Sequence, residues 1–79
     1  MINDDLKEKI IDLANRYKNA EIQINSARTA KLKMAEKFLL LDITEENFDE
    51  IADIFSKTSG GYLLDLAYQD CVDEITAED

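Results

Sequence analysis

Apolar side chains recur at alternating steps of four and three along the first half of the chain. The series consists of Leu6, Ile10, Leu13, Tyr17, Ala20, Ile24, Ala27, Lys31, Met34, Phe38 and Leu41. Such heptad spacing is typical of a helix that packs along a narrow stripe. Asn3 is a suitable N-cap, because its side chain can accept a hydrogen bond from the first helical turn. Asp4 and Asp5 follow it and suit the positive end of the helix dipole. We therefore expect helix over residues 3–41.

This heptad stripe is weakest in its middle. Ala20, Ala27 and the polar Lys31 provide little apolar surface there. The dipeptide Asn25-Ser26 is also the weakest helix-forming stretch of the segment. A bend or a break is therefore expected at this dipeptide, if the helix is interrupted at all.

Two structures fit the stripe. One is a single long helix over residues 3–41, and the other is a helical hairpin that turns near residues 19–26. The absence of glycine and proline from residues 1–59 favours the single helix, straight or gently bent. A helix that long would exceed what two short helices can cover, so its stripe would need a second chain or a target. Continuity of the helix and self-association are thus linked expectations.

Two shorter helices are expected after residue 41. Thr44-Glu45-Glu46-Asn47 resembles a capping box, with Asn47 where Glu or Gln is usual. A helix over residues 44–57 follows from it. Its apolar face consists of Phe48, Ile51, Ala52 and Phe55.

Gly60 and Gly61 are the only glycines, and they predict the end of this helix. The last helix is expected over residues 62–76, with Leu63, Leu64, Ala67, Cys71 and Ile75 on its inner face. Since 79 residues suffice for one domain, we expect residues 1–79 to form a single all-α helical bundle.

Candidate catalytic chemistry is scarce. The chain has no histidine and a single cysteine, so neither a disulfide within the chain nor a usual zinc site can form. Cys71 falls on an apolar face beside Asp70 and Asp73, which disfavour its thiolate. A calcium loop starting at Asp42 fails, because Asn47 stands where glycine is required. We therefore expect a protein that is not an enzyme and that uses no metal or other cofactor.

Charge is segregated along the chain, whose net charge is −9. Residues 16–37 carry six basic and two acidic side chains, whereas residues 38–79 carry twelve acidic side chains and Lys57 alone. One interpretation is that the acidic helices fold back beside the basic stretch and pair with it. The other is an acidic interaction surface for a basic partner.

The acidic surface is expected to form a ridge over the last two helices. Its residues are Asp42, Glu46, Asp49, Glu50, Asp53, Asp65, Asp70, Asp73 and Glu74. Such a ridge could occupy a basic groove that a partner protein uses for nucleic acid.

Three further sets of residues are candidates for binding. Tyr62 and Tyr68 are candidate interface aromatics, because amphipathic tyrosines often anchor interfaces. A candidate self-association seam consists of Leu6, Ile10, Leu13, Tyr17 and Ile24. A basic patch consists of Arg28, Lys31, Lys33 and Lys37. The strongly acidic net charge makes direct binding of nucleic acid by this patch the weakest of the three.

The leading hypothesis is a small acidic protein–protein interaction module, for example an inhibitor or accessory factor of a nucleic-acid-binding protein. The alternative is a homodimeric, coiled-coil-like assembly adaptor. The start of the chain does not fit a secretory signal and the longest apolar run is short, so a cytoplasmic, membrane-free setting is expected. In general build the chain resembles small accessory proteins of phages and mobile elements, a resemblance that would place it in the host cytosol and carries no site residues.

Overall fold

The structure is a computed structural model that describes residues 2–22 and 27–77. These residues form four helices and no strand. The helices are α1 (Asp4–Ile22), α2 (Ala27–Leu39), α3 (Phe48–Ser59) and α4 (Leu64–Ala77). The prediction of a small all-α bundle is confirmed.

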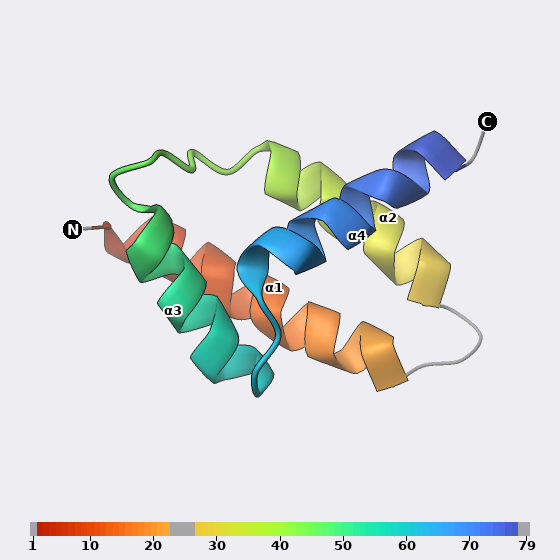
Figure 1. Ribbon diagram of the computed structural model, residues 1–79, viewed down its shortest axis with the longest axis horizontal. Helices are drawn as coiled ribbons and strands as arrows, with labels where there is room; N and C mark the ends of the chain where they lie inside the picture. Colours follow the sequence, from red (N-terminus) through yellow and green to blue (C-terminus); the bar gives the residue numbers. More distant parts are fainter. Residues whose placement is uncertain (1, 23–26, 78–79) are drawn as a thin grey trace.

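The helix expected over residues 3–41 is in fact two helices. α1 ends at Ile22, α2 begins at Ala27, and α2 runs back against α1 (Figure 1). The preference for one continuous or gently bent helix was therefore wrong, and the helical hairpin is the structure observed. Asn25 and Ser26, where an interruption was expected, lie outside the described residues.

Reversal of the chain lets the heptad stripe cover itself. Ile10 and Leu13 of α1, and Met34 and Phe38 of α2, are all at most 1% exposed. Burying one such side chain stabilises the fold by about 1.5–3 kcal/mol. A straight helix would leave much of this apolar surface in water. The stabilisation from burying it therefore outweighs the local preference for an uninterrupted helix in a segment without glycine.

α3 and α4 complete the core by crossing the hairpin. α3 packs against α1, and α4 packs against α2, while α3 and α4 touch each other less (Figure 1). The Phe55 ring of α3 lies 6.2 Å from the rings of both Tyr17 and Phe38. A single aromatic-rich core therefore joins α1, α2 and α3, and α4 adds Leu64, Ala67 and Cys71 to it.

The predicted N-cap at Asn3 forms, whereas the predicted cap at Thr44 forms a turn before α3, whose own N-cap, Asn47, makes no side-chain cap hydrogen bond. The Leu6 backbone N–H donates to Asn3 Oδ1 over 2.8 Å. The Thr44 N–H donates to Asn47 Oδ1 over 2.8 Å, and the Asn47 N–H donates to Thr44 Oγ1 over 3.3 Å. This reciprocal pair is the hydrogen-bond pattern of a capping box. Because residues 45–47 form a turn, α3 itself begins at Phe48 rather than at Thr44.

The two glycines end α3. Gly60 adopts a left-handed conformation with φ of 84°, and the Gly61 N–H donates to the Ser56 carbonyl over 2.8 Å. The buried Ser59 hydroxyl accepts from the Tyr62 N–H over 3.2 Å, so it also satisfies a donor of the turn. This turn directs the chain into α4, which begins at Leu64, two residues later than expected.

We expect Gly60→Ala to lower the free energy of unfolding by about 1–2 kcal/mol, the cost of a left-handed conformation for an L-residue. A Cβ at Gly60 would meet no atom within 4 Å, so the loss would arise from the backbone alone. Gly60→Asn is the matched control, since asparagine tolerates this conformation better. Urea unfolding of the three proteins tests this, and equal losses in both variants would contradict it.

Candidate functional site

A polar cluster lies where α1, α2 and α4 meet. Lys31 Nζ lies 2.9 Å from Asp70 Oδ2 and 3.0 Å from Glu21 Oε1. The Tyr17 hydroxyl donates to the same Asp70 oxygen over 2.7 Å. Lys31 Nζ also lies 5.9 Å from the centre of the Tyr17 ring. One side chain from the heptad stripe thus binds two carboxylates of other helices.

The ionisation of the polar cluster reflects these contacts. Burial disfavours the charged form of Asp70, but hydrogen bonds from Tyr17 and Lys31 outweigh it and lower its pKa. Burial likewise opposes the charge of Lys31, yet its two carboxylate partners raise its pKa. Burial, followed by the bond to Asp70, raises the pKa of Tyr17. At neutral pH the cluster therefore holds the Lys31 ammonium, the Asp70 carboxylate and the neutral phenol of Tyr17.

Cys71, next to Asp70, faces the core. Its side chain is fully buried, and burial, followed by the charge of Asp70, raises the pKa of its thiol to about 12. The thiol is thus protonated and inaccessible at neutral pH. Among residues 2–22 and 27–77, no three carboxylates or thiols converge as metal ligands.

The basic patch is partly consumed by the fold. Lys31 belongs to the polar cluster and is only 17% exposed. The Arg28 guanidinium lies 3.3 Å from the Glu74 carboxylate of α4. Lys33 and Lys37 remain exposed. The structure therefore does not present these four side chains as one free cationic surface.

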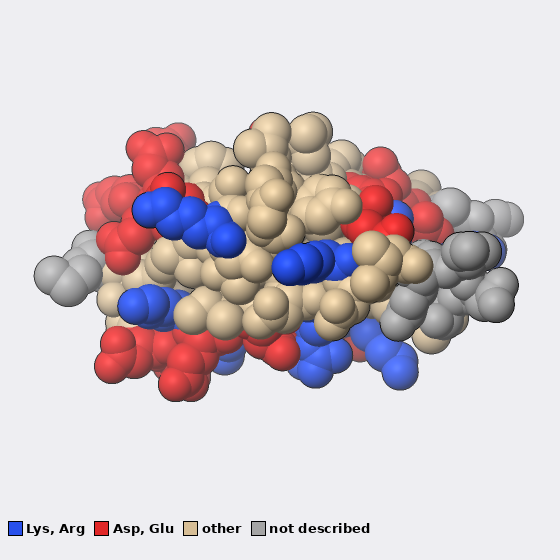
Figure 2. Space-filling model, turned by 90° about the horizontal axis from the view of Figure 1, so that it is seen from below, with Lys and Arg blue, Asp and Glu red and all other residues tan. Residues whose placement is uncertain are grey.

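The expected acidic ridge is divided by the structure. On α4, Asp70 and Glu74 pair with basic side chains of α2, and Asp73 accepts from the Gln69 amide over 2.7 Å. Figure 2 shows carboxylates in separate groups toward the two ends of one face, with lysine and arginine side chains between them. Asp70 and Glu74 are therefore paired within the molecule, whereas Asp65, at the start of α4, is exposed and forms no ion pair among the described residues.

The acids around α3 differ from Asp70 and Glu74. We call this set the α3 acidic face: Asp42, Glu46, Asp49, Glu50 and Asp53. All five are exposed. Among the described residues, Asp53 pairs with Lys57 alone, one helical turn away at 3.0 Å, and Glu50 accepts a hydrogen bond from the Ile2 backbone N–H at 3.4 Å. The other three make no ion pair within the part of the chain that the structure describes.

The candidate self-association seam faces inward. Ile10, Leu13 and Tyr17 are buried in the core, and Leu6 packs against its edge. Ile24 lies outside the described residues. Because Ile10, Leu13 and Tyr17 are buried within this chain, they are not available to a second copy.

The two candidate interface tyrosines lie on opposite sides of the core. The Tyr62 ring packs edge-on against Tyr17 at 5.1 Å, and the Tyr68 ring packs edge-on against Phe38 at 5.6 Å. Both stay partly accessible. Tyr68 also lines an open groove.

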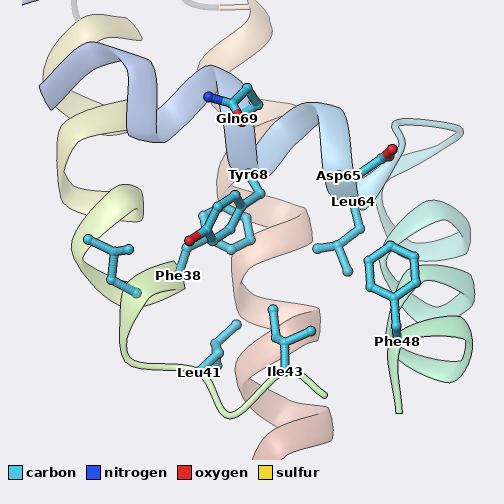
Figure 3. A pocket seen from close by; sticks show the side chains of 9 residues that line it. Phe38, Leu41, Ile43, Phe48, Leu64, Asp65, Tyr68 and Gln69 are labelled. Atoms are coloured by element: carbon cyan, nitrogen blue, oxygen red, sulfur yellow. The ribbon is translucent and has the colours of Figure 1, made fainter. Parts of the chain in front are cut away.

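This apolar groove lies between the end of α2, the start of α3 and the first turns of α4 (Figure 3). Its volume is about 430 Å³. Its lining consists of Phe38, Leu39, Leu41, Ile43, Phe48, Leu64, Asp65, Tyr68 and Gln69. In Figure 3 the labelled apolar side chains of Phe38, Leu41, Ile43, Phe48 and Leu64 surround the opening.

Sequence reasoning missed the apolar groove. Its signal was the run Phe38-Leu39-Leu40-Leu41, because one helical face cannot bury four consecutive side chains. Leu39 is 55% exposed and lines the groove. A single exposed leucine is common on protein surfaces, so Leu39 alone did not indicate a groove. The remaining lining residues come from three other segments, whose meeting point depends on the tertiary structure.

Asp70→Asn is expected to destabilise the fold at neutral pH, because it leaves Lys31 with one carboxylate partner. A carboxylate with a lowered pKa stabilises the folded state above its unfolded pKa, about 3.9, and this contribution is lost as pH falls further. The difference from the parent should therefore shrink at about pH 3. Urea unfolding at both pH values measures it. Asp73→Asn, on the same helix, is the control, and a pH-independent difference for Asp70→Asn would contradict the expectation.

Cys71 should react with a thiol reagent at least about a hundredfold more slowly in the folded protein than in urea. Burial and the raised thiol pKa, about 12, both suppress the reactive thiolate. The absorbance of the released thiolate dye measures the rate, and Cys71→Ala serves as the blank. Similar rates in the folded and unfolded protein would show that the thiol is accessible.

Comparisons with protein-family models, with curated proteins and with solved structures find no match to this chain. None of the helices in the described ranges combines the length and the apolarity that crossing a bilayer requires.

Proposed function

We propose that this chain is a non-enzymatic protein–protein interaction module that binds a basic partner protein through its α3 acidic face. A partner surface built to bind nucleic acid has the required positive charge. A cytoplasmic setting fits a chain whose one cysteine, Cys71, is free and buried. The resemblance in build to accessory proteins of mobile elements agrees with an inhibitory or adaptor role.

The observation that carries this proposal is the contrast between the two groups of acids. Asp70 and Glu74 have internal basic partners, so their charge is used in folding. On the α3 acidic face, Asp49 has no ion-pair partner among the described residues, and the Asp53 pair is well exposed. Exposed pairs of that kind contribute about 1 kcal/mol or less, so the α3 acids are largely free for a partner.

The other two functions have less support. A coiled-coil dimer would need the seam residues Ile10, Leu13 and Tyr17, which the core already occupies. Direct binding of nucleic acid would need Lys31 and Arg28, which already pair with acids of other helices. Each of these functions therefore has less free surface than the sequence suggested.

Capture from an extract of the cells that produce the protein tests this function, followed by affinity measurements on the purified partner. We expect a basic partner and an affinity that falls strongly between low and high salt, because screening weakens exposed charge interactions. The double variant Asp49→Lys/Asp53→Lys should weaken binding about tenfold or more, since attractive pairs become repulsive.

Glu8→Lys/Glu36→Lys is the matched control for this experiment. It changes the net charge equally, at two exposed acids on α1 and α2. Circular dichroism should show that both double variants stay folded. Equal weakening by the two variants, or binding that is indifferent to salt, would exclude the α3 acidic face as the binding surface.

A further inference from the structure

The apolar groove is an opening that the fold itself leaves unfilled. Two residues of its lining stay exposed to water, Phe48 at 37% and Leu39 at 55%. Its volume of about 430 Å³ falls in the range of about 300–1,000 Å³ typical of binding pockets. Covering these two side chains would remove apolar surface from water, which favours binding.

We propose that the apolar groove binds an amphipathic helix of the partner, whose apolar side chains enter the groove and whose flanking side chains are basic. This inference rests on the proposed function and names the binding element of the partner. The groove would thus supply apolar anchorage, while the α3 acidic face beside it would supply attraction and orientation.

Charge around the groove selects for a basic occupant. Asp65 is the only charged residue in the lining. Asp42 stands between two lining residues in the chain, and Asp49 directly follows the lining residue Phe48. All three acids are exposed, and none forms an ion pair within the described residues. An apolar segment flanked by lysine or arginine therefore matches the groove in both polarity and charge.

A second copy of this chain is a poorer occupant. In a symmetric dimer the same patch meets itself, so the acids at the groove would face identical acids. The net charge of −9 would add to that repulsion. Like charges brought together at an interface disfavour the complex.

Secondary structure favours a helix as the bound element. The described residues form helices and no strand, so they offer no sheet edge for pairing with an extended peptide. An amphipathic helix satisfies its own backbone and presents side chains at i, i+3, i+4 and i+7 along one face. Such a row suits a groove with walls from the ends and starts of three helices.

The probe is a synthetic helical peptide of leucine and lysine with leucines at i, i+3, i+4 and i+7. A peptide of the same composition with scattered leucines controls for charge attraction, and a leucine–glutamate peptide controls for apolar binding. Fluorescence anisotropy of labelled peptides gives the affinities for the full chain. We expect the leucine–lysine helix to bind most tightly, and equal binding of the glutamate peptide would overturn the choice of a basic occupant.

Leu39→Ser and Leu66→Ser form a matched pair of variants. Leu66 is 63% exposed, comparable to Leu39, but it does not line the groove. Because about half of the Leu39 surface is still free to be covered, Leu39→Ser should weaken binding about fivefold. Leu66→Ser should leave the affinity unchanged. Amide shifts of Leu41, Ile43 and Tyr68 on peptide addition provide a second measurement that does not depend on a substitution.

Failure of this inference can be told apart from failure of the proposed function. If Leu39→Ser and Leu66→Ser bind the peptide equally and the amide shifts lie elsewhere, the groove is not the site, although the cellular partner can still depend on Asp49 and Asp53. If the groove binds the peptide but Asp49→Lys/Asp53→Lys still captures the cellular partner normally, the proposed function fails while the groove remains a helix-binding site.

Discussion

The ammonium group of Lys31 is the constraint around which the molecule is arranged. It interrupts an apolar stripe that must be buried, and it is only 17% exposed, so an unpaired charge there would be costly. Glu21 from α1 and Asp70 from α4 approach it together. The same contacts that neutralise Lys31 thus determine how α1, α2 and α4 meet, and the Tyr17 hydroxyl completes the arrangement. An apolar residue at this position would not specify which helix lies above it.

The division of acidic charge follows from this constraint. The carboxylates of α4 that face α2 find cations there, whereas α3 packs against α1 through Ile51 and Phe55 and turns its acids outward. The chain therefore combines an internally compensated half with an uncompensated surface beside the apolar groove. Both of our proposals depend on this uneven distribution of paired and unpaired acids. Solubility alone would explain the exposed acids, but it would not explain an apolar groove beside them.

Features that depend on near neighbours could be predicted from the sequence. Caps and turns depend on hydrogen bonds and backbone conformations within a few residues, so they could be recognised in advance at Asn3, Thr44, Asn47 and Gly60. The burial of Cys71 also followed from helical spacing. Lys31 could be identified as an anomaly in the stripe, but its partners Glu21 and Asp70 are brought to it by chain reversal. The groove was likewise unpredictable, because its walls come from separated segments that each look ordinary alone.

The pairing of α1 with α3 and of α2 with α4 has a consequence for how the protein forms. Each of these pairs skips a helix, so the contacts that close the core join distant parts of the chain. Such long-range contacts slow folding relative to a bundle whose successive helices pack in order. During synthesis the hairpin of α1 and α2 would emerge before α3 and α4. Its apolar stripe would then be only partly covered, and Lys31 would lack its ion pair with Asp70. The core can therefore close only after α4 has emerged and Asp70 can meet Lys31.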